Sequence, residues 1–294
     1  MILLNRTLIG LSLMFTWGCL AVAQEQPGGS VPKVLQITRE YTKPGRNGAV
    51  HDKSESAFVE AMARAKWPTH YLGMTSLSGK QRALFLTSYD SFAAWQKDAE
   101  NTEKNAALAS TLDRANVSDG DLLDSVDQGV FYFREEMSLR PLADLSHTRF
   151  LDVTVFHVRP GKSREWQELS KMAKEAYGKA DPDAHWGMFE LVYGGDGGTF
   201  LLLTARKSLA EVDREYGMEK KLEAAVGEET LKKMGEMFGE TVDSTQSQLF
   251  AYNPAMSYVD EAWIKSDPDF WKPANKMVAK AASAKSATDE KVKP

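Results

Sequence analysis

Two histidines in equivalent positions are the residues of this sequence best suited to chemistry. His70 and His185 each begin an apolar, strand-like run, and an aromatic residue follows each of them, Tyr71 or Trp186. Histidine is the commonest general base and metal ligand near neutral pH. Such a pair could bind a haem, a metal or an acidic ligand. The alternative is a pair of structural histidines that bond backbone carbonyls or cap a helix, and the lack of Glu-x-x-His or His-x-x-x-His spacing favours it.

The other histidines and the short acidic motifs point to no metal centre. His51, His147 and His157 have no counterpart elsewhere in the chain and indicate no cluster. The acidic segments 119–121 and 181–183 lack the spacing of a calcium loop, so turn or capping roles are expected for them. The sequence therefore predicts no metal site, and it leaves the catalytic residues, if there are any, unknown.

The histidine pair belongs to an internal repeat, which decides the architecture. Residues 34–46 read VLQITREYTKPGR and residues 150–162 read FLDVTVFHVRPGK, so the copies start 116 residues apart. Each copy reads as a strand that ends in a basic-Pro-Gly-basic turn. We therefore expect two copies of one small α+β unit, over residues 34–140 and 148–258.

Each copy has the order strand, helix, strand, strand, helix, strand. A helix follows each Pro-Gly turn, and Ser163 is the expected N-cap of the second one. The glycine-rich segment 194–198 is expected to be a hairpin turn and not a phosphate loop, since no helix follows it. The expected hairpin strands are 70–77, 82–89, 185–193 and 199–206, and the expected last strands are 129–134 and 248–252.

This order is that of the ferredoxin-like fold, in which a four-stranded antiparallel sheet carries both helices on one face. The other face of such a sheet is apolar and needs a partner. We therefore predict an α+β protein, with two tandem ferredoxin-like β-α-β-β-α-β units packed sheet to sheet as a pseudo-dimeric α+β barrel. A chain that supplies both units closes its own barrel, which predicts a monomer.

The order and the two turns, at residues 43–46 and 159–162, resemble the dimeric α+β barrel superfamily, which includes antibiotic-biosynthesis-monooxygenase-like and NIPSNAP-like domains. The resemblance covers residues 34–138 and 150–258. It implies a cleft between sheet and helices that takes hydrophobic ligands, sometimes haem. The Asn/His/Trp constellation of the haem-degrading members has no match here. By the resemblance, the pocket-lining candidates are Tyr41, His157, Tyr71, Trp186, Met74 and Met188, although strand alternation favours core positions for the methionines.

Residues 1–23 have the pattern of a signal peptide. Arg6 gives a positive start, residues 7–20 are apolar and uncharged, and a small-x-small site ends at Ala23. The apolar run is shorter than the ~20 residues of a membrane span, so we expect no stable membrane insertion. Export to the periplasm or the medium is expected. Cys19, the only cysteine, has flanks that fit a lipidation motif poorly, so a lipoprotein anchor is the less favoured alternative.

Composition limits the partners. The net charge is −5, and it becomes −6 when Arg6 leaves with the leader, which argues against a nucleic-acid partner. With 43% apolar and 10% aromatic residues the chain can build a core without disulfides. Residues 24–33 are expected to be a linker, and residues 259–294 a C-terminal extension. Its lysine- and alanine-rich part from about residue 276 has the composition of a disordered tail.

The sequence thus predicts an exported protein that binds a hydrophobic or acidic small molecule within the duplicated barrel. The alternative is a monooxygenase-like or haem-binding oxidoreductase of the same superfamily. The Pro-Gly turns are expected to be architectural, although their basic residues could instead hold an anion at a helix N-terminus. The candidate ligand-binding residues are His70, His185, Tyr71, Trp186, Tyr41 and His157.

Overall fold

A computed structural model describes residues 31–142 and 144–272 of the chain. The expected leader with Cys19, and the tail from about residue 276, lie outside the described residues. Eight antiparallel strands form one closed barrel in the order β1-β3-β2-β8-β5-β7-β6-β4. The strands are β1 Val34–Thr42, β2 Tyr71–Ser76, β3 Arg82–Tyr89, β4 Leu123–Phe133, β5 Phe150–Val158, β6 Gly187–Tyr193, β7 Thr199–Arg206 and β8 Val242–Tyr252.

The barrel consists of two four-stranded units with the same internal order. Unit 1 runs β4-β1-β3-β2, and unit 2 runs β8-β5-β7-β6. The units join at their edges, where β2 pairs with β8 and β4 pairs with β6. Edge pairing leaves no strand with an open side, which removes the liability of an exposed sheet edge. The predicted α+β fold, a pseudo-dimer of two ferredoxin-like units, is confirmed, including the hairpin at the glycine-rich segment.

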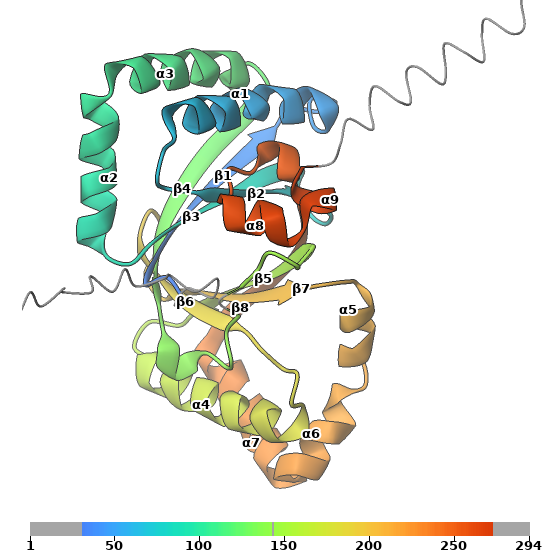
Figure 1. Cartoon of the computed structure of the whole chain (residues 1–294). Coiled ribbons are helices and arrows are strands. Elements are labelled where there is room, and N and C mark those ends of the chain that lie inside the picture. Colours follow the sequence, from blue (N-terminus) through green and yellow to red (C-terminus); the bar gives the residue numbers. More distant parts are fainter. Residues whose placement is uncertain (1–30, 143, 273–294) are drawn as a thin grey trace, which may run out of the picture.

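Helices cover the outer face of each unit, on opposite sides of the barrel (Figure 1). The helices α1 and α3 lie over unit 1, and α4, α6 and α7 lie over unit 2, while α2 and α5 run along the sides. Their bounds are α1 Ala49–Ala65, α2 Phe92–Lys104, α3 Ala106–Gly120, α4 Ser163–Ala180, α5 Ala210–Glu215, α6 Met218–Val226 and α7 Glu228–Thr241.

The barrel interior is the main hydrophobic core. Successive side chains of a strand point to opposite faces, so every second residue enters the barrel. Ile37, Met74, Phe131 and Phe250 are almost fully buried there. Met74 is thus a core residue, as expected, whereas Met188 faces the helices of unit 2.

The sheet register corrects one detail of the sequence repeat. Met74 and Met188 look equivalent in sequence. Gly73 lies opposite Phe85 in unit 1, and Met188 lies opposite Leu202 in unit 2. The position equivalent to Met188 is therefore Gly73, one residue before Met74.

The Pro-Gly turns have an architectural role. Gly45 and Gly161 have φ of +76° and +80°, a conformation that other residues rarely adopt, while a Cβ at either position would meet no atom within 4 Å. Lys43 Nζ donates to the Asp121 carbonyl at 2.9 Å, and Arg159 Nη1 donates to Asp243 Oδ1 at 2.7 Å. These cations tie each turn to the start of the last strand of its own unit.

Two local expectations were wrong. Ser163 is the first residue of α4 and not its N-cap, because the turn at Gly161 leads directly into the helix and Lys162 takes the cap position. The last strands β4 and β8 begin six residues earlier than expected. Most of their added residues are polar and exposed, and backbone pairing with β1 or β5 holds this part of each strand in place.

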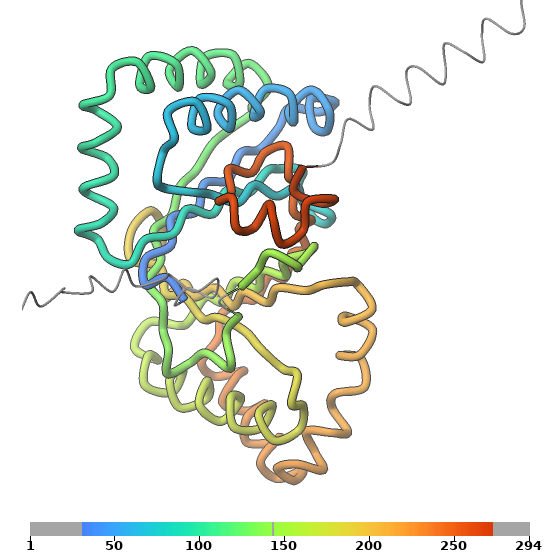
Figure 2. The backbone as a smooth tube through the Cα atoms, viewed as in Figure 1, coloured from blue at the N-terminus to red at the C-terminus, as the bar shows by residue number. Residues whose placement is uncertain are grey.

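The chain returns to the barrel after unit 2. The segment from η2 (Pro254–Met256) continues into the short helices α8 (Glu261–Ser266) and α9 (Pro268–Trp271) (Figure 2). Trp263 and Phe270 of these helices pack against the barrel core. Trp271 is buried and donates to the Ser146 carbonyl at 2.8 Å. In the described part of the chain, no helix combines the length and apolarity that a membrane crossing requires.

Candidate functional site

The structure brings four of the six candidate residues together. His70, Tyr71, His185 and Trp186 line a cavity of about 320 Å³ at one end of the barrel, where β2 and β6 begin. The first residues of β1 and β5 and the last residues of β3 and β7 add to its wall, as do residues of the segments 141–145 and 259–263. Tyr41 and His157 do not line this cavity, because they lie at the opposite ends of β1 and β5.

The two histidines have different environments. Both ring nitrogens of His185 face backbone carbonyl oxygens, Nδ1 at 2.8 Å from Asp183 and Nε2 at 2.8 Å from Ala205. His185 is thus a structural residue whose nitrogens are engaged. His70 stacks on Tyr258, with ring centroids 4.7 Å apart, and burial lowers the pKa of His70 although Asp260 opposes this.

The aromatic residues that follow the histidines point toward the helix layers. Tyr71 packs edge-on against Phe85 on the outer face of unit 1, and burial raises the pKa of its phenol. Trp186 packs edge-on against Tyr177 of α4, and its Nε1 donates to the Met137 carbonyl at 2.9 Å. The pair His70–Tyr71 in unit 1 and the pair His185–Trp186 in unit 2 therefore each lie between the barrel-end cavity and the space between sheet and helices.

A larger cavity, of about 510 Å³, lies between the sheet of unit 2 and the helices α4, α6 and α7. His185 and Trp186 line it as well as the barrel-end cavity. It is the sheet-to-helix cleft that the resemblance implied. Its apolar wall consists of aromatic, leucine and methionine side chains, among them Phe156, Trp166, Leu169, Tyr177, Met188, Leu202, Met218, Met234 and Phe238.

Three polar atoms of the described residues that line this cavity have no hydrogen-bond partner, namely Arg206 Nε at the rim and two groups on α4. Trp166 Nε1 and Ser170 Oγ, both on α4, are buried without a hydrogen bond. The residues are 3% and 5% exposed. Buried polar groups are normally hydrogen-bonded, since an unpaired one costs about 1–3 kcal/mol. An indole N–H can only donate, so a ligand that satisfies it must present an acceptor atom.

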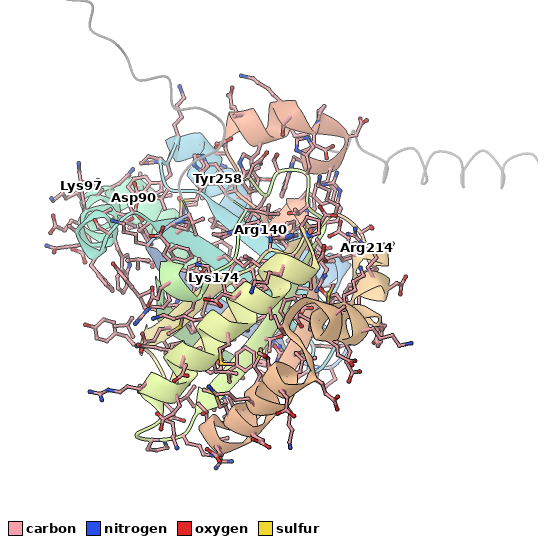
Figure 3. The ribbon with its side chains drawn as sticks, turned by 90° about the horizontal axis from the view of Figure 1, so that it is seen from below. Asp90, Lys97, Arg140, Lys174, Arg214 and Tyr258 are labelled. Atoms are coloured by element: carbon pink, nitrogen blue, oxygen red, sulfur yellow. The ribbon has the colours of Figure 1, made fainter. Side chains whose placement is uncertain are left out.

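The rim of the cavity is charged and mostly acidic. Arg206 is buried between Asp152, at 3.0 Å, and Glu215, at 2.8 Å. Burial acts to lower the pKa of Arg206, but these two carboxylates outweigh it and raise that pKa. Arg214 lies on the helix side of unit 2 (Figure 3) and pairs with Asp183 at 3.7 Å.

A haem, which the resemblance implies for some members, does not fit the residues of this cavity. His185, the histidine of the described lining, has both ring nitrogens in contact with backbone carbonyl oxygens at 2.8 Å, so neither nitrogen is free to approach iron. The lining has two arginines, and both already pair with carboxylates. The haem propionates would therefore meet an acidic rim.

Sequence reasoning missed a second polar site, which lies in unit 1. The expectation that His51 indicates no cluster was wrong, and so was the turn or capping role expected for Asp119. His51 Nε2 lies 3.3 Å from Glu40 Oε2, 3.5 Å from Asp119 Oδ1 and 3.8 Å from Glu55 Oε1. We name these four residues the acid–histidine cluster. Only the His51/Glu55 spacing of four residues on one helix was visible in the sequence, because β1 and α3 supply the other two members.

The acid–histidine cluster has strongly shifted pKa values. Burial, together with the charges of Glu40 and Asp119, raises the pKa of Glu55 to about 9. Burial acts to lower the pKa of His51, but the neighbouring carboxylates outweigh it and raise that pKa to about 10. Without an ion, protons on Glu55 and His51 thus reduce the negative charge of the cluster near neutral pH.

The two polar sites occupy equivalent places in the two units. Glu40 and Phe156 are equivalent in the strands, 116 residues apart, and Asp119 and Phe238 each lie four residues before the last strand of their unit. On the first helix of each unit the buried positions match at an offset of 115, His51 with Trp166 and Glu55 with Ser170. All four residues of unit 2 line its large cavity.

Comparisons with known proteins agree on the fold. No protein-family model and no curated protein matches the chain in sequence. A candidate monooxygenase from Fusobacterium nucleatum is similar in structure, with a TM-score of 0.50 and 11% identity, over 75% of this chain and 92% of that chain. At this identity the likeness shows the fold alone, that of the dimeric α+β barrel proteins.

Two other solved structures are more distant. An anthrone oxidase-like protein has a TM-score of 0.49 and 12% identity, over 80% of this chain and 97% of that chain. A chlorite dismutase from Candidatus Nitrospira defluvii, a variant in complex with cyanide, has a TM-score of 0.44 and 10% identity, over 77% of this chain and 93% of that chain. Likeness at this level adds nothing on chemistry.

Proposed function

We propose that this protein binds a flat, apolar small molecule with an acceptor oxygen, in the cavity between the sheet and the helices of unit 2. One observation carries the proposal. The indole N–H of Trp166 and the hydroxyl of Ser170 are buried without partners beside the aromatic and aliphatic side chains of the cavity wall. A carbonyl or hydroxyl oxygen on the ligand would satisfy both groups.

The size and lining of the cavity support this ligand class. A volume of about 510 Å³ lies within the ~300–1,000 Å³ of small-molecule sites. Aromatic rings and flexible thioethers, such as those of Phe156, Met218 and Met234, suit a rigid apolar guest.

A neutral ligand is favoured over an acidic one. The described lining holds five carboxylates against two guanidinium groups. A carboxylate or phosphate would meet like charge at this rim, and like charges repel most strongly where water is excluded. Of the two ligand classes expected from the sequence, we therefore propose the hydrophobic one.

Oxidation of the bound molecule is a second candidate function, as the name of the Fusobacterium neighbour suggests. The observation that favours it is Asp152, a carboxylate in the cavity wall that could accept a proton from a substrate. Asp152 already accepts from Arg206 at 3.0 Å. Binding without turnover is therefore the leading proposal.

The origin and the setting of the protein are further proposals. We propose that the two units arose by tandem duplication of an antibiotic-biosynthesis-monooxygenase-like or NIPSNAP-like domain, because their strand order and Pro-Gly turns coincide. We also propose export after cleavage of residues 1–23, and a monomer in solution, since the barrel closes within one chain. Light scattering at micromolar concentration tests the monomer, and N-terminal sequencing of the exported protein tests the cleavage.

The binding proposal is tested with a matched pair of probes. 1,4-Naphthoquinone presents acceptor oxygens, and naphthalene has the same two rings without oxygen. Calorimetry should show that Trp166→Phe weakens naphthoquinone binding about 5–10-fold, the worth of one hydrogen bond, while naphthalene binding stays unchanged. Trp95→Phe on α2, outside both cavities, is the control.

Two outcomes would decide against these proposals. The assigned hydrogen bond would be contradicted if Trp166→Phe lowered the affinity for both probes equally, or if it lowered the affinity for neither. Oxygen consumption with 1-naphthol that disappears in Asp152→Asn would favour the oxidative alternative over simple binding.

A further inference from the structure

We propose that unit 1 holds a divalent transition-metal ion in the acid–histidine cluster, a site independent of the ligand cavity of unit 2. Each of the four side chains offers one ligand atom, and these atoms all lie within 4.8 Å of one another. The ligands are Glu40 from β1, His51 and Glu55 from α1, and Asp119 from α3.

The ligand atoms are buried and face one another without forming a hydrogen bond. The side chains of His51, Glu55 and Asp119 are 4%, 5% and 3% exposed. His51 Nε2, Glu55 Oε1, Asp119 Oδ1 and Glu40 Oε2 are each buried without a hydrogen bond. A single ring nitrogen carries at most one proton and cannot donate to three oxygens at once. Buried carboxylates without a compensating partner cost several kcal/mol each, so the arrangement calls for a cation.

The spacing of the atoms matches a coordination shell. Zinc-type ligands lie about 2.0–2.2 Å from the ion, which places neighbouring ligands about 3–3.6 Å apart in tetrahedral or octahedral geometry. The three distances from His51 Nε2 are 3.3, 3.5 and 3.8 Å. All four ligand atoms lie within 4.8 Å of one another, so an ion could enter with side-chain shifts of up to about 1 Å.

The donor set indicates the class of ion. Three carboxylate oxygens favour hard cations, and one imidazole favours Mn²⁺, Fe²⁺ or Zn²⁺ over Mg²⁺ and Ca²⁺. Copper(I) would require the sulfur ligands that this cluster lacks. Ligand deprotonation leaves three negative charges, of which a divalent ion neutralises two. The buried hydroxyl of Tyr71, also without a partner, is close enough for the charges of Glu55 and Glu40 to act on it.

The location assigns the ion a structural role. The four ligands come from one strand and two helices, so the ion would hold α1 and α3 against β1. None of the four residues lines either of the two cavities. The equivalent positions of unit 2, taken by Phe156, Trp166, Ser170 and Phe238, offer no ligand set of this kind.

Metal content and calorimetry test the site. The full-length protein, first dialysed against a chelator, is titrated with Mn²⁺ and with Zn²⁺. Wild type should bind one equivalent, and Glu55→Gln and Asp119→Asn should each weaken binding at least 10-fold, with a Mn²⁺ electron paramagnetic resonance spectrum that reverts to that of the free ion. Glu60→Gln, an exposed acid on the same helix, is the control and should bind as wild type does.

Folding of each variant is checked by its melting curve without metal. Added metal should raise the melting temperature of wild type and of Glu60→Gln but not that of Glu55→Gln, since an ion that binds the folded state stabilises it. The proposal fails if wild type binds no Mn²⁺ or Zn²⁺ at millimolar concentration. It also fails if two folded variants, Glu55→Gln and Asp119→Asn, bind the ions as tightly as wild type.

Discussion

Units 1 and 2 have the same strand order and the same turn at the end of the first strand, and helices cover the outer face of both (Figure 1). The spaces beneath those helices differ. In unit 2 the space is a cavity of about 510 Å³ with an aromatic wall. In unit 1 it contains four ionisable side chains that contact one another.

Residue types at four equivalent positions contribute to this contrast, together with the helices α5 and α6, whose residues line the cavity of unit 2. Glu40 has the place of Phe156, and His51 has the place of Trp166. Four such exchanges turn an apolar pocket into a polar cluster within one framework. The comparison shows how a duplicated fold can bind two different classes of ligand, since function resides in sites and not in the fold itself.

The largest loss of stability is expected when the central residue of each site is replaced by its counterpart from the other unit. His51→Trp places a large ring where the structure has no cavity and leaves three buried carboxylates without their histidine, so we expect a loss of about 4–5 kcal/mol. Trp166→His should cost about 2–4 kcal/mol, because it removes the ring contacts with Phe156 and Phe200 at 5.1 and 5.3 Å. Urea unfolding measures both. If His51→Trp lowered the free energy of unfolding less than Trp166→His does, the proposed difference between a filled polar site and an open apolar cavity would be wrong.

The strand beneath each site provides a second test. A Cβ at Gly73 would lie 2.4 Å from the Met256 carbonyl oxygen, so Gly73→Ala should destabilise by about 2–3 kcal/mol. Met188 has the equivalent place in unit 2, where a long side chain fits. Gly187→Ala is the control. Its Cβ would meet only a ring edge of Phe189 at 3.0 Å, and we expect about 1 kcal/mol. If thermal unfolding showed the same loss of stability for Gly73→Ala and Gly187→Ala, the space between sheet and helices would not be packed more tightly in unit 1 than in unit 2.

The third test uses pH. Burial raises the pKa of Tyr252 to about 12, against 10.0 for a free phenol. The folded state thus favours the neutral phenol, and the resulting stability is complete below pH 10 and is lost as the pH rises to 12. The expected loss is about 2–3 kcal/mol.

The matched variant for the pH test is Tyr252→Phe, which installs the residue type of the equivalent position in unit 1, Phe133. The free energy of unfolding, measured by urea denaturation from pH 9 to 12, should fall less steeply in this variant than in wild type. Identical slopes would mean that the buried phenol does not contribute.

Substitutions in the two Pro-Gly turns should cause a small loss of stability that is nearly the same in both units. Gly45→Val and Gly161→Val should each cost about 1–3 kcal/mol, because both glycines have positive φ. The two losses should agree to within about 0.5 kcal/mol if the turns are equivalent. Arg46→Ala and Lys162→Ala, measured with an acidic ligand, are the counter-test, since a large fall in affinity there would support an anion site instead.

The sequence allowed the architecture to be predicted because the repeat and the strand periodicity are local signals. The turns at Gly45 and Gly161, both hairpins and the helical face of α4 all follow from residues close in the chain. The first six residues of β4 and of β8 could not be predicted in this way. They show no hydrophobic alternation, and backbone hydrogen bonds to a strand distant in the sequence hold them in the sheet.

The sites were only partly predictable, for the same reason. His70 and His185 attracted attention because they repeat, and the structure places both at one cavity. The acid–histidine cluster unites residues from β1, α1 and α3 and is not repeated, so neither spacing nor symmetry pointed to it. Trp166 lies in the helix that was expected after the second Pro-Gly turn, but its unsatisfied N–H depends on tertiary packing.

A crystal structure of the protein soaked with Mn²⁺ and 1,4-naphthoquinone would show whether the two units hold chemically different sites at equivalent places. We expect an anomalous peak between Glu40, His51, Glu55 and Asp119, and quinone density with an oxygen within hydrogen-bond distance of Trp166 Nε1. A quinone in the barrel-end cavity alone, with no anomalous peak in unit 1, would contradict this expectation.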